Sequence, residues 1–131
     1  MSTLHFDRAS GRLFLLDANM KPLGGPWVAA NFVDSSSKGP FPPGTFKVDA
    51  WQSHQAHDGP DTVFGTQGVL LFLVPGRDGM GVHAGRQNSA DGLGRKGPFH
   101  CTFGCIRTSE DAMRAISDTD AKDRVTEITV T

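Results

Sequence analysis

The sequence contains no tyrosine, only two cysteines, no excess of charge of either sign and no long apolar run. Two cysteines are too few for a disulfide-dense scaffold. Lys and Arg number 13 against 14 Asp and Glu, which argues against a general nucleic-acid partner, since such proteins carry a basic excess. The longest apolar run, residues 69–74, is far too short to cross a bilayer, so no membrane insertion is expected.

Glycine and proline are instead abundant, with 16 and 8 copies, or about 18% of the chain. So many turn-forming residues exclude a helical bundle and indicate short strands joined by turns. The length of 131 residues predicts a single domain spanning residues 1–131. Residues 1–7 lack the basic start and apolar core of a secretory leader, so no signal peptide is expected.

Local patterns predict a mainly β domain with one short helix. The strands are expected at residues 3–7, 12–16, 27–33, 45–51, 69–74, 80–84 and 124–131. Asp78 and Gly79 are expected to form the turn between the two central strands. The helix is expected to begin after the hydroxyl cap at residues 108–109 and to run to about residue 118. The polar segment 52–68 is expected to be a loop that lines a substrate site.

His83 and Cys105 are the candidate catalytic residues. A cysteine attacks as thiolate and needs a nearby base, which His83 supplies if the two strands lie side by side. Gly104 permits a sharp turn beside the sulfur, so that the amides of residues 103–105 face a developing oxyanion. Arg107 adds positive charge near a substrate carboxylate or oxyanion. The competing interpretation is that Cys105 is a small buried apolar residue and His83 an ordinary core residue.

Three segments together resemble the active-site signature of the YkuD-type L,D-transpeptidases. They are residues 39–48 (Gly-Pro-Phe-Pro-Pro-Gly-Thr-Phe-Lys-Val), 81–85 (Gly-Val-His-Ala-Gly) and 102–107 (Thr-Phe-Gly-Cys-Ile-Arg). Their order and spacing agree with the family pattern. The resemblance implies the β-sandwich or barrel-like L,D-transpeptidase fold, with its short helix after the catalytic cysteine, and requires no cofactor or metal.

The resemblance also implies roles for individual residues. Cys105 is the expected nucleophile and His83 the base, with the backbone carbonyl of Ala84 orienting its second nitrogen and Gly104 contributing to the oxyanion hole. Thr102 and Arg107 are expected as supporting polar groups. The expected substrate-binding residues are Arg107, Thr102, Phe103 and Arg86. The sequence departs from the family in two places. Phe103 stands where many members carry a second histidine, and the spacer at residues 85–97 is longer than usual, which affects the expected shape of the cleft.

The implied reaction is acyl transfer on the tetrapeptide stem of peptidoglycan. The Cys105 thiolate attacks the carbonyl of the third stem residue, terminal D-alanine leaves, and a thioester remains on the enzyme. Water would make the protein an L,D-carboxypeptidase, whereas an amine would give crosslinking or D-amino-acid exchange. The sequence leaves these outcomes open.

Residues 4–13 are similar to the start of small effectors of this superfamily that bacteria deliver by type VI secretion. The similarity implies an antibacterial toxin that is made in the cytoplasm and acts in the periplasm of a target bacterium. A cognate immunity protein would then be a partner.

Other interpretations remain. His83, His100, Cys101 and Cys105 contain no Cys-x-x-Cys pair, which disfavours zinc, and the polar cluster at residues 54–58 is expected to be solvated. A disulfide between Cys101 and Cys105 would disable the nucleophile. Papain-like and NlpC-type peptidases place cysteine before histidine, opposite to the order here. From another class, a non-catalytic module would bind cell-wall glycopeptide through residues 85–88 and 95–96.

Overall fold

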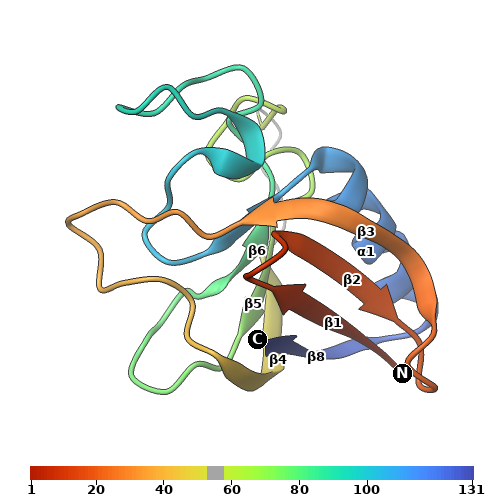
Figure 1. The fold of residues 1–131 in the computed structure, drawn as a ribbon. Coiled ribbons are helices and arrows are strands. Elements are labelled where there is room, and N and C mark those ends of the chain that lie inside the picture. The colour runs from red at the N-terminus through yellow and green to blue at the C-terminus, as the bar shows by residue number, and fades with distance from the viewer. Residues whose placement is uncertain (53–57) are drawn as a thin grey trace.

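The computed structural model describes residues 1–52 and 58–131, which form short strands and one helix that lies behind β3 (Figure 1). The strands are β1 (Ser2–Asp7), β2 (Arg12–Leu16), β3 (Pro22–Ala30), β4 (Gly44–Gln52), β5 (Val69–Phe72), β6 (Gly81–His83), β7 (Ile106–Thr108) and β8 (Val125–Val130). A 3-10 turn, η1 (Gly97–Phe99), precedes β7, and the helix α1 (Glu110–Lys122) follows it.

The strands close into a barrel in the order β1-β2-β3-β7-β6-β5-β4-β8. Most neighbours are antiparallel, but β1 pairs with β8 and β6 pairs with β7 in parallel. The first and last strands of the chain therefore complete the barrel together. The prediction of a mainly β, barrel-like fold with one helix after Cys105 is confirmed.

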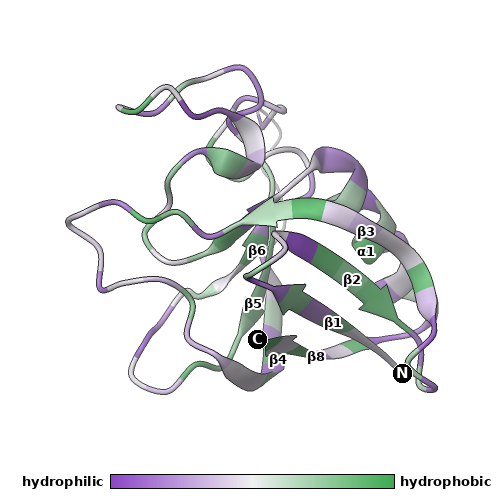
Figure 2. Cartoon of the chain, viewed as in Figure 1, coloured by the Kyte–Doolittle hydropathy of each residue, from purple (hydrophilic) through white to green (hydrophobic). Residues whose placement is uncertain are grey.

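The core follows from the alternation of side chains along the strands. In β1, Leu4 and Phe6 are buried while the intervening residues are partly exposed, and the same alternation of hydropathy is visible along this strand in Figure 2. From α1, Met113 and Ile116 join the same core cluster, and the helix packs against β3 and β8. Within the described ranges, no helix has the length and apolar character needed to span a membrane.

Several predicted boundaries are corrected. The strand expected at residues 27–33 is β3, which begins at Pro22 and ends at Ala30, and the helix continues to Lys122. The connection between β5 and β6 holds two turns: Asp78 and Gly79 lie in a turn as expected, with Gly79 at φ +72°, and a second turn at Pro75 and Gly76 precedes it, in which Arg77 N donates to Val74 O (3.0 Å). Gly76 has φ +73°, the left-handed conformation that glycine adopts readily after proline in a type II turn.

The helix begins where its cap predicts. Ser109 is the N-cap, and its hydroxyl accepts a hydrogen bond from Ala112 N (3.1 Å). Glu110 and Asp111 occupy the first turn, where the helix dipole favours carboxylates. The three residues of β7 lie between Cys105 and this cap. A strand thus positions the residues that follow the cysteine.

Candidate active site

A cavity of about 520 Å³ brings together the side chains of His83, Cys105 and most of the other predicted site residues. It is lined by Asp34, Val63, Phe64, Gly79, His83, Arg86, His100, Cys101, Thr102, Phe103, Cys105 and Arg107. Val63 and Phe64 come from the segment predicted to line the substrate site. Residues 53–57 of that segment, with His54 and His57, lie outside the described residues.

The parallel pairing of β6 and β7 brings His83 and Cys105 to one cavity. His83 lies opposite Arg107 in the register, and Cys105 stands immediately before β7, two residues before Arg107. The side chains of all three residues line the same cavity. The strands at this point do lie side by side, as pairing of a base with the thiol requires.

His83 is held as a neutral base. The residue is 2% exposed, and its Nδ1 lies 2.7 Å from Ala84 O, the carbonyl that was predicted to orient the ring. A carbonyl only accepts, so Nδ1 carries the proton and Nε2 keeps a lone pair. Burial, aided by the charge of Arg107 and opposed by the Ala84 bond, lowers the pKa of His83 to about 4. The ring of Phe64 packs edge-on against the imidazole at 4.9 Å between centroids.

The lowered pKa of His83 predicts a pH dependence of stability. Between pH 6.5 and about 4 the unfolded chain binds a proton at this histidine while the folded protein does not. The free energy of unfolding should therefore be intact above pH 6.5 and fall as pH drops, by about 3 kcal/mol over the window. Urea unfolding at intervals from pH 7 to 4.5 measures this slope. His83→Gln should flatten it; an unchanged slope in the variant would contradict the assignment.

Cys105 rests as a protonated thiol. Its Sγ donates to Gly79 O at 3.4 Å. Burial raises the pKa of the Cys105 thiol, while a backbone hydrogen bond from Gly81 and the charges of Arg107 and Arg77 act in the opposite direction. A base must therefore remove the proton before the sulfur attacks. Both Cys101 and Cys105 are free thiols.

The turn that carries Cys105 is fixed by two polar side chains. Gly104 has φ +136°, which side-chain-bearing residues rarely adopt. The Thr102 hydroxyl accepts from Gly104 N (3.1 Å) and donates to Cys105 O (2.7 Å). Asn31 Nδ2 donates to Gly104 O (2.9 Å) and Cys105 O (2.8 Å), while its Oδ1 accepts from Phe41 N (2.6 Å). Asn31 was not among the predicted residues, because its position just after β3 carries no motif.

Asn31→Ala should loosen the turn on which the nucleophile sits. It removes two donors to partly buried carbonyls, so we expect a loss of about 1–3 kcal/mol in the free energy of unfolding. Urea unfolding checks this value, with Asn19→Ala as control, because Asn19 donates to Asp17 Oδ1 (2.8 Å) through its backbone N, a bond that alanine keeps. Equal stability of both variants would show that the Asn31 bonds contribute nothing.

Two predicted roles need correction at this turn. The Gly104 amide already donates to Thr102, so the expected oxyanion hole narrows to the amides of Phe103 and Cys105. Thr102 is itself buried and engaged with the backbone, which makes it a support of the turn rather than a substrate contact.

Arg107 is likewise committed to the protein. It is 2% exposed, and its three nitrogens donate to backbone carbonyls. The acceptors are Ala84 O (3.2 Å), His100 O (3.0 Å), Cys101 O (3.0 Å) and Val63 O (3.0 Å). Because Ala84 O also orients His83, the geometry gives Arg107 a positioning role in place of the predicted direct contact with substrate.

Phe103 and Arg86 remain the predicted substrate contacts. Phe103 is 72% exposed and lines the cavity. Arg86 is half-buried on the same wall, with its backbone held at φ +55° by a bond from its amide to Thr62 O (3.1 Å). Across residues 1–52 and 58–131, its guanidinium makes no hydrogen bond or ion pair at contact distance, and its charge acts on Asp61 and Arg107.

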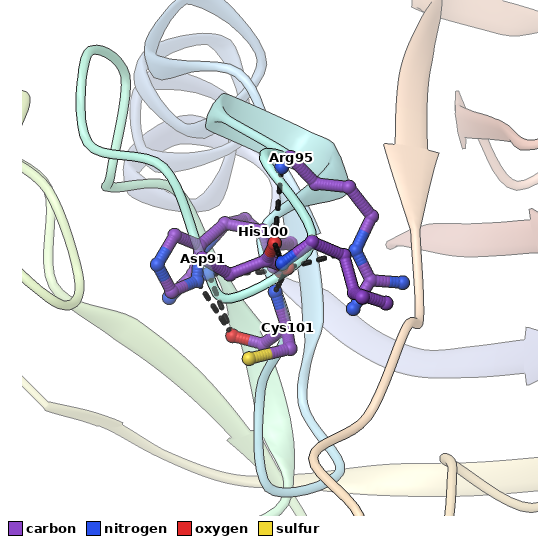
Figure 3. A network of polar contacts seen from close by, with 6 residues as sticks. Asp91, Arg95, His100 and Cys101 are labelled. Atoms are coloured by element: carbon purple, nitrogen blue, oxygen red, sulfur yellow. Dashed lines mark hydrogen bonds and ion pairs between the residues drawn. The ribbon is translucent and has the colours of Figure 1, made fainter.

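A cluster of Asp91, His100 and Cys101 has three ligand-type atoms within 4.8 Å of one another (Figure 3). Asp91 already accepts hydrogen bonds from Leu93 N, Arg95 N, Arg95 Nε (2.7 Å) and Cys101 N. These bonds use the lone pairs that a cation would need, and the Arg95 charge neutralises the carboxylate. The cluster therefore suits a structural brace of the 91–101 loop better than a metal, and it includes neither Cys105 nor His83.

No family model matches the sequence, and no curated protein matches it. Solved structures do match in fold, and they define it as that of the L,D-transpeptidases, which confirms the predicted fold. One match is an L,D-transpeptidase from Xylanimonas cellulosilytica, with TM-score 0.64 and 17% identity over 99% of this chain and 60% of that one.

Two further solved structures match this chain with similar TM-scores and similarly low sequence identity. An L,D-transpeptidase from Stackebrandtia nassauensis gives TM-score 0.63 at 14% identity, over 99% of this chain and 55% of that one. L,D-transpeptidase 1 of Mycobacterium tuberculosis gives 0.61 at 15% identity, over 98% and 60%. The chain thus spans less than two thirds of the length of these proteins, and the likeness is one of fold.

Proposed function

We propose that the protein is a cysteine-dependent acyltransferase that acts on peptidoglycan stem peptides. The observation that carries the proposal is that His83 at the end of β6 and Cys105 just before the paired strand β7 line one cavity, with the free lone pair of His83 on Nε2. The fold, shared with structures named as L,D-transpeptidases, supports the substrate class.

In the proposed mechanism the Cys105 thiol gives its proton to His83 Nε2 and the sulfur attacks the carbonyl of the third stem residue. The amides of Phe103 and Cys105 stabilise the oxyanion. The proton held by His83 then passes to the departing amine of D-alanine, which leaves a thioester on Cys105. Water or an acceptor amine cleaves the thioester and regenerates the thiol. Ala84 O keeps His83 in the required tautomer throughout.

The proposal is tested by incubating the protein with disaccharide tetrapeptide and following the products by mass. Loss of one D-alanine indicates carboxypeptidase activity, a 3-3 dimer indicates crosslinking, and incorporation of an added D-amino acid indicates exchange. Absence of all three products would refute the proposed acyl transfer.

We also propose that the protein serves as an effector delivered into the periplasm of a target bacterium, where a cognate immunity protein would counter it. The similarity of residues 4–13 to type VI effectors supports this role. Expression directed to the periplasm of a Gram-negative host should then cause swelling or lysis. The Cys105→Ala variant should be harmless, and equal toxicity of both proteins would contradict a catalytic toxin.

A second candidate is a non-catalytic module that binds cell-wall glycopeptide. The burial that raises the pKa of Cys105 and lowers that of His83 favours it, because both groups rest in their uncharged forms. The two candidates differ in turnover. A pure binding module retains stem peptide equally well in wild type and Cys105→Ala and releases no D-alanine from either.

A further inference from the structure

We propose that Arg77 is a positioning residue for the nucleophile, whose guanidinium braces the turn before Cys105 and places positive charge beside the thiolate. The inference rests on the proposed function, since it concerns how the acyl-transfer thiolate is formed. Arg77 was not among the predicted site residues, and it comes from the connection between β5 and β6 rather than from the strands that carry His83 and Arg107.

The guanidinium of Arg77 links two segments that are distant in sequence. Its Nη1 donates to Pro40 O (3.0 Å) and its Nη2 to Gly39 O (2.7 Å), and Nη2 also reaches Phe103 O at 3.5 Å. The glycine- and proline-rich segment at residues 39–44 thus provides fixed acceptors for the arginine. These acceptors hold the charged group against the turn at residues 103–105.

Gly104 shows how closely this charge approaches the nucleophile. A Cβ placed on Gly104 would collide with Arg77 Nη2 and with Met80 Sδ, so the guanidinium lies directly over the Gly104 backbone. The thiol of Cys105, the next residue, bonds Gly79 O, two positions after Arg77. The arginine and the carbonyl that holds the thiol therefore belong to one short segment, and glycine at position 104 is required for their approach.

Two arginines, Arg107 and Arg77, act on the charge of Cys105, and the structure holds them differently. The other titratable and charged groups on the cavity wall are Asp34, His83, Arg86, His100 and Cys101, and Asp78 follows Arg77 in the chain. Arg107 is buried and donates its hydrogen bonds to four backbone carbonyls. Arg77 is half-buried and lies at the edge of the turn at residues 103–105. Both arginines oppose the effect of burial on the pKa of Cys105.

The test is the pH dependence of Cys105 alkylation by iodoacetamide, measured by mass in a Cys101→Ser background so that one thiol reacts. Arg77→Gln should raise the midpoint by at least about half a pH unit, because the thiolate loses a nearby cation. Arg77→Lys keeps the charge and should stay close to the parent midpoint. The matched control is Arg114→Gln on the exposed face of α1, which should leave the midpoint unchanged.

The direction of the shift separates charge from mere structural support. If Arg77 only held the fold, its loss would expose the thiol to water and lower the midpoint, since burial is what raises it. An unchanged or lowered midpoint in Arg77→Gln therefore overturns the proposal. If Arg77→Gln does not fold, Arg77→Lys decides, and a midpoint more than about half a unit from the parent overturns it.

Measurement of turnover gives a second test, and it distinguishes failure of the Arg77 proposal from failure of the proposed acyl transfer. Alkylation requires no substrate, so a wild-type protein that shows the expected midpoints but forms no product refutes the acyl transfer and leaves the charge pairing standing. With turnover, Arg77→Lys should lower kcat more than it raises KM, because a single ammonium cannot reproduce the fork in which Nη1 bonds Pro40 O while Nη2 bonds Gly39 O. An unchanged kcat overturns the bracing part of the proposal.

Discussion

Cys105→Ala is expected to reduce the release of D-alanine from tetrapeptide substrate by at least about 10³-fold, to the background of the assay. Without the sulfur, no thioester forms, and His83 has no proton to take up. The residual binding of substrate by the cavity should persist, because alanine removes only one atom from its wall. Product formation followed by mass, with initial rates for both proteins, gives the comparison.

The matched control for this prediction is Cys101→Ala. Cys101 lies on the same cavity wall, but Arg107 bonds its backbone carbonyl, which alanine keeps. The variant should therefore retain most of the wild-type rate. Loss of activity in Cys101→Ala together with its retention in Cys105→Ala would reverse the assignment of the nucleophile.

Arg107→Met is expected to be the most destabilising single change at the site. The substitution leaves four backbone carbonyls without their donor in a buried position, which should lower the free energy of unfolding by about 3–5 kcal/mol. It also frees Ala84 O, so His83 loses part of its orientation. Urea unfolding measures the loss of stability. The remaining D-alanine release is assayed without urea.

Arg114→Met provides the comparison for this prediction. Arg114 is exposed on α1, and a surface substitution of this kind should change stability by no more than about 0.5 kcal/mol. If Arg107→Met is equally mild, the four hydrogen bonds are not what holds the cavity wall, and the positioning role of Arg107 is wrong.

Strand alternation and turn residues predicted much of the fold. β1, β2, β4, β5, β6 and β8 all fall on predicted segments, and Ser109 caps the helix as its hydroxyl indicates. The closure of the barrel did not follow from local patterns, because the parallel pairing of β1 with β8 joins opposite ends of the chain. The three-residue strand β7 was also missed, since Ile106 to Thr108 is too short to show a period.

The residues of the candidate site likewise include some that local sequence predicted and others that it did not. His83 and Cys105 were predicted because each stands in a short motif with glycine neighbours. Asn31, Arg77 and the four carbonyls of Arg107 were not, because these contacts join segments that only the tertiary fold brings together. The residue type alone suggested a substrate-binding arginine at position 107, whereas the fold directs its guanidinium nitrogens to four backbone carbonyls, which no sequence pattern indicates.

The measurement closest to the central claim is the mass of the intact protein during reaction with disaccharide tetrapeptide. We expect a transient increase in mass equal to the substrate minus one D-alanine, located on Cys105 by peptide mapping and absent in Cys105→Ala. A His83→Gln variant should form the adduct far more slowly. D-alanine release without any adduct on Cys105, or an adduct on Cys101 alone, would contradict the central claim.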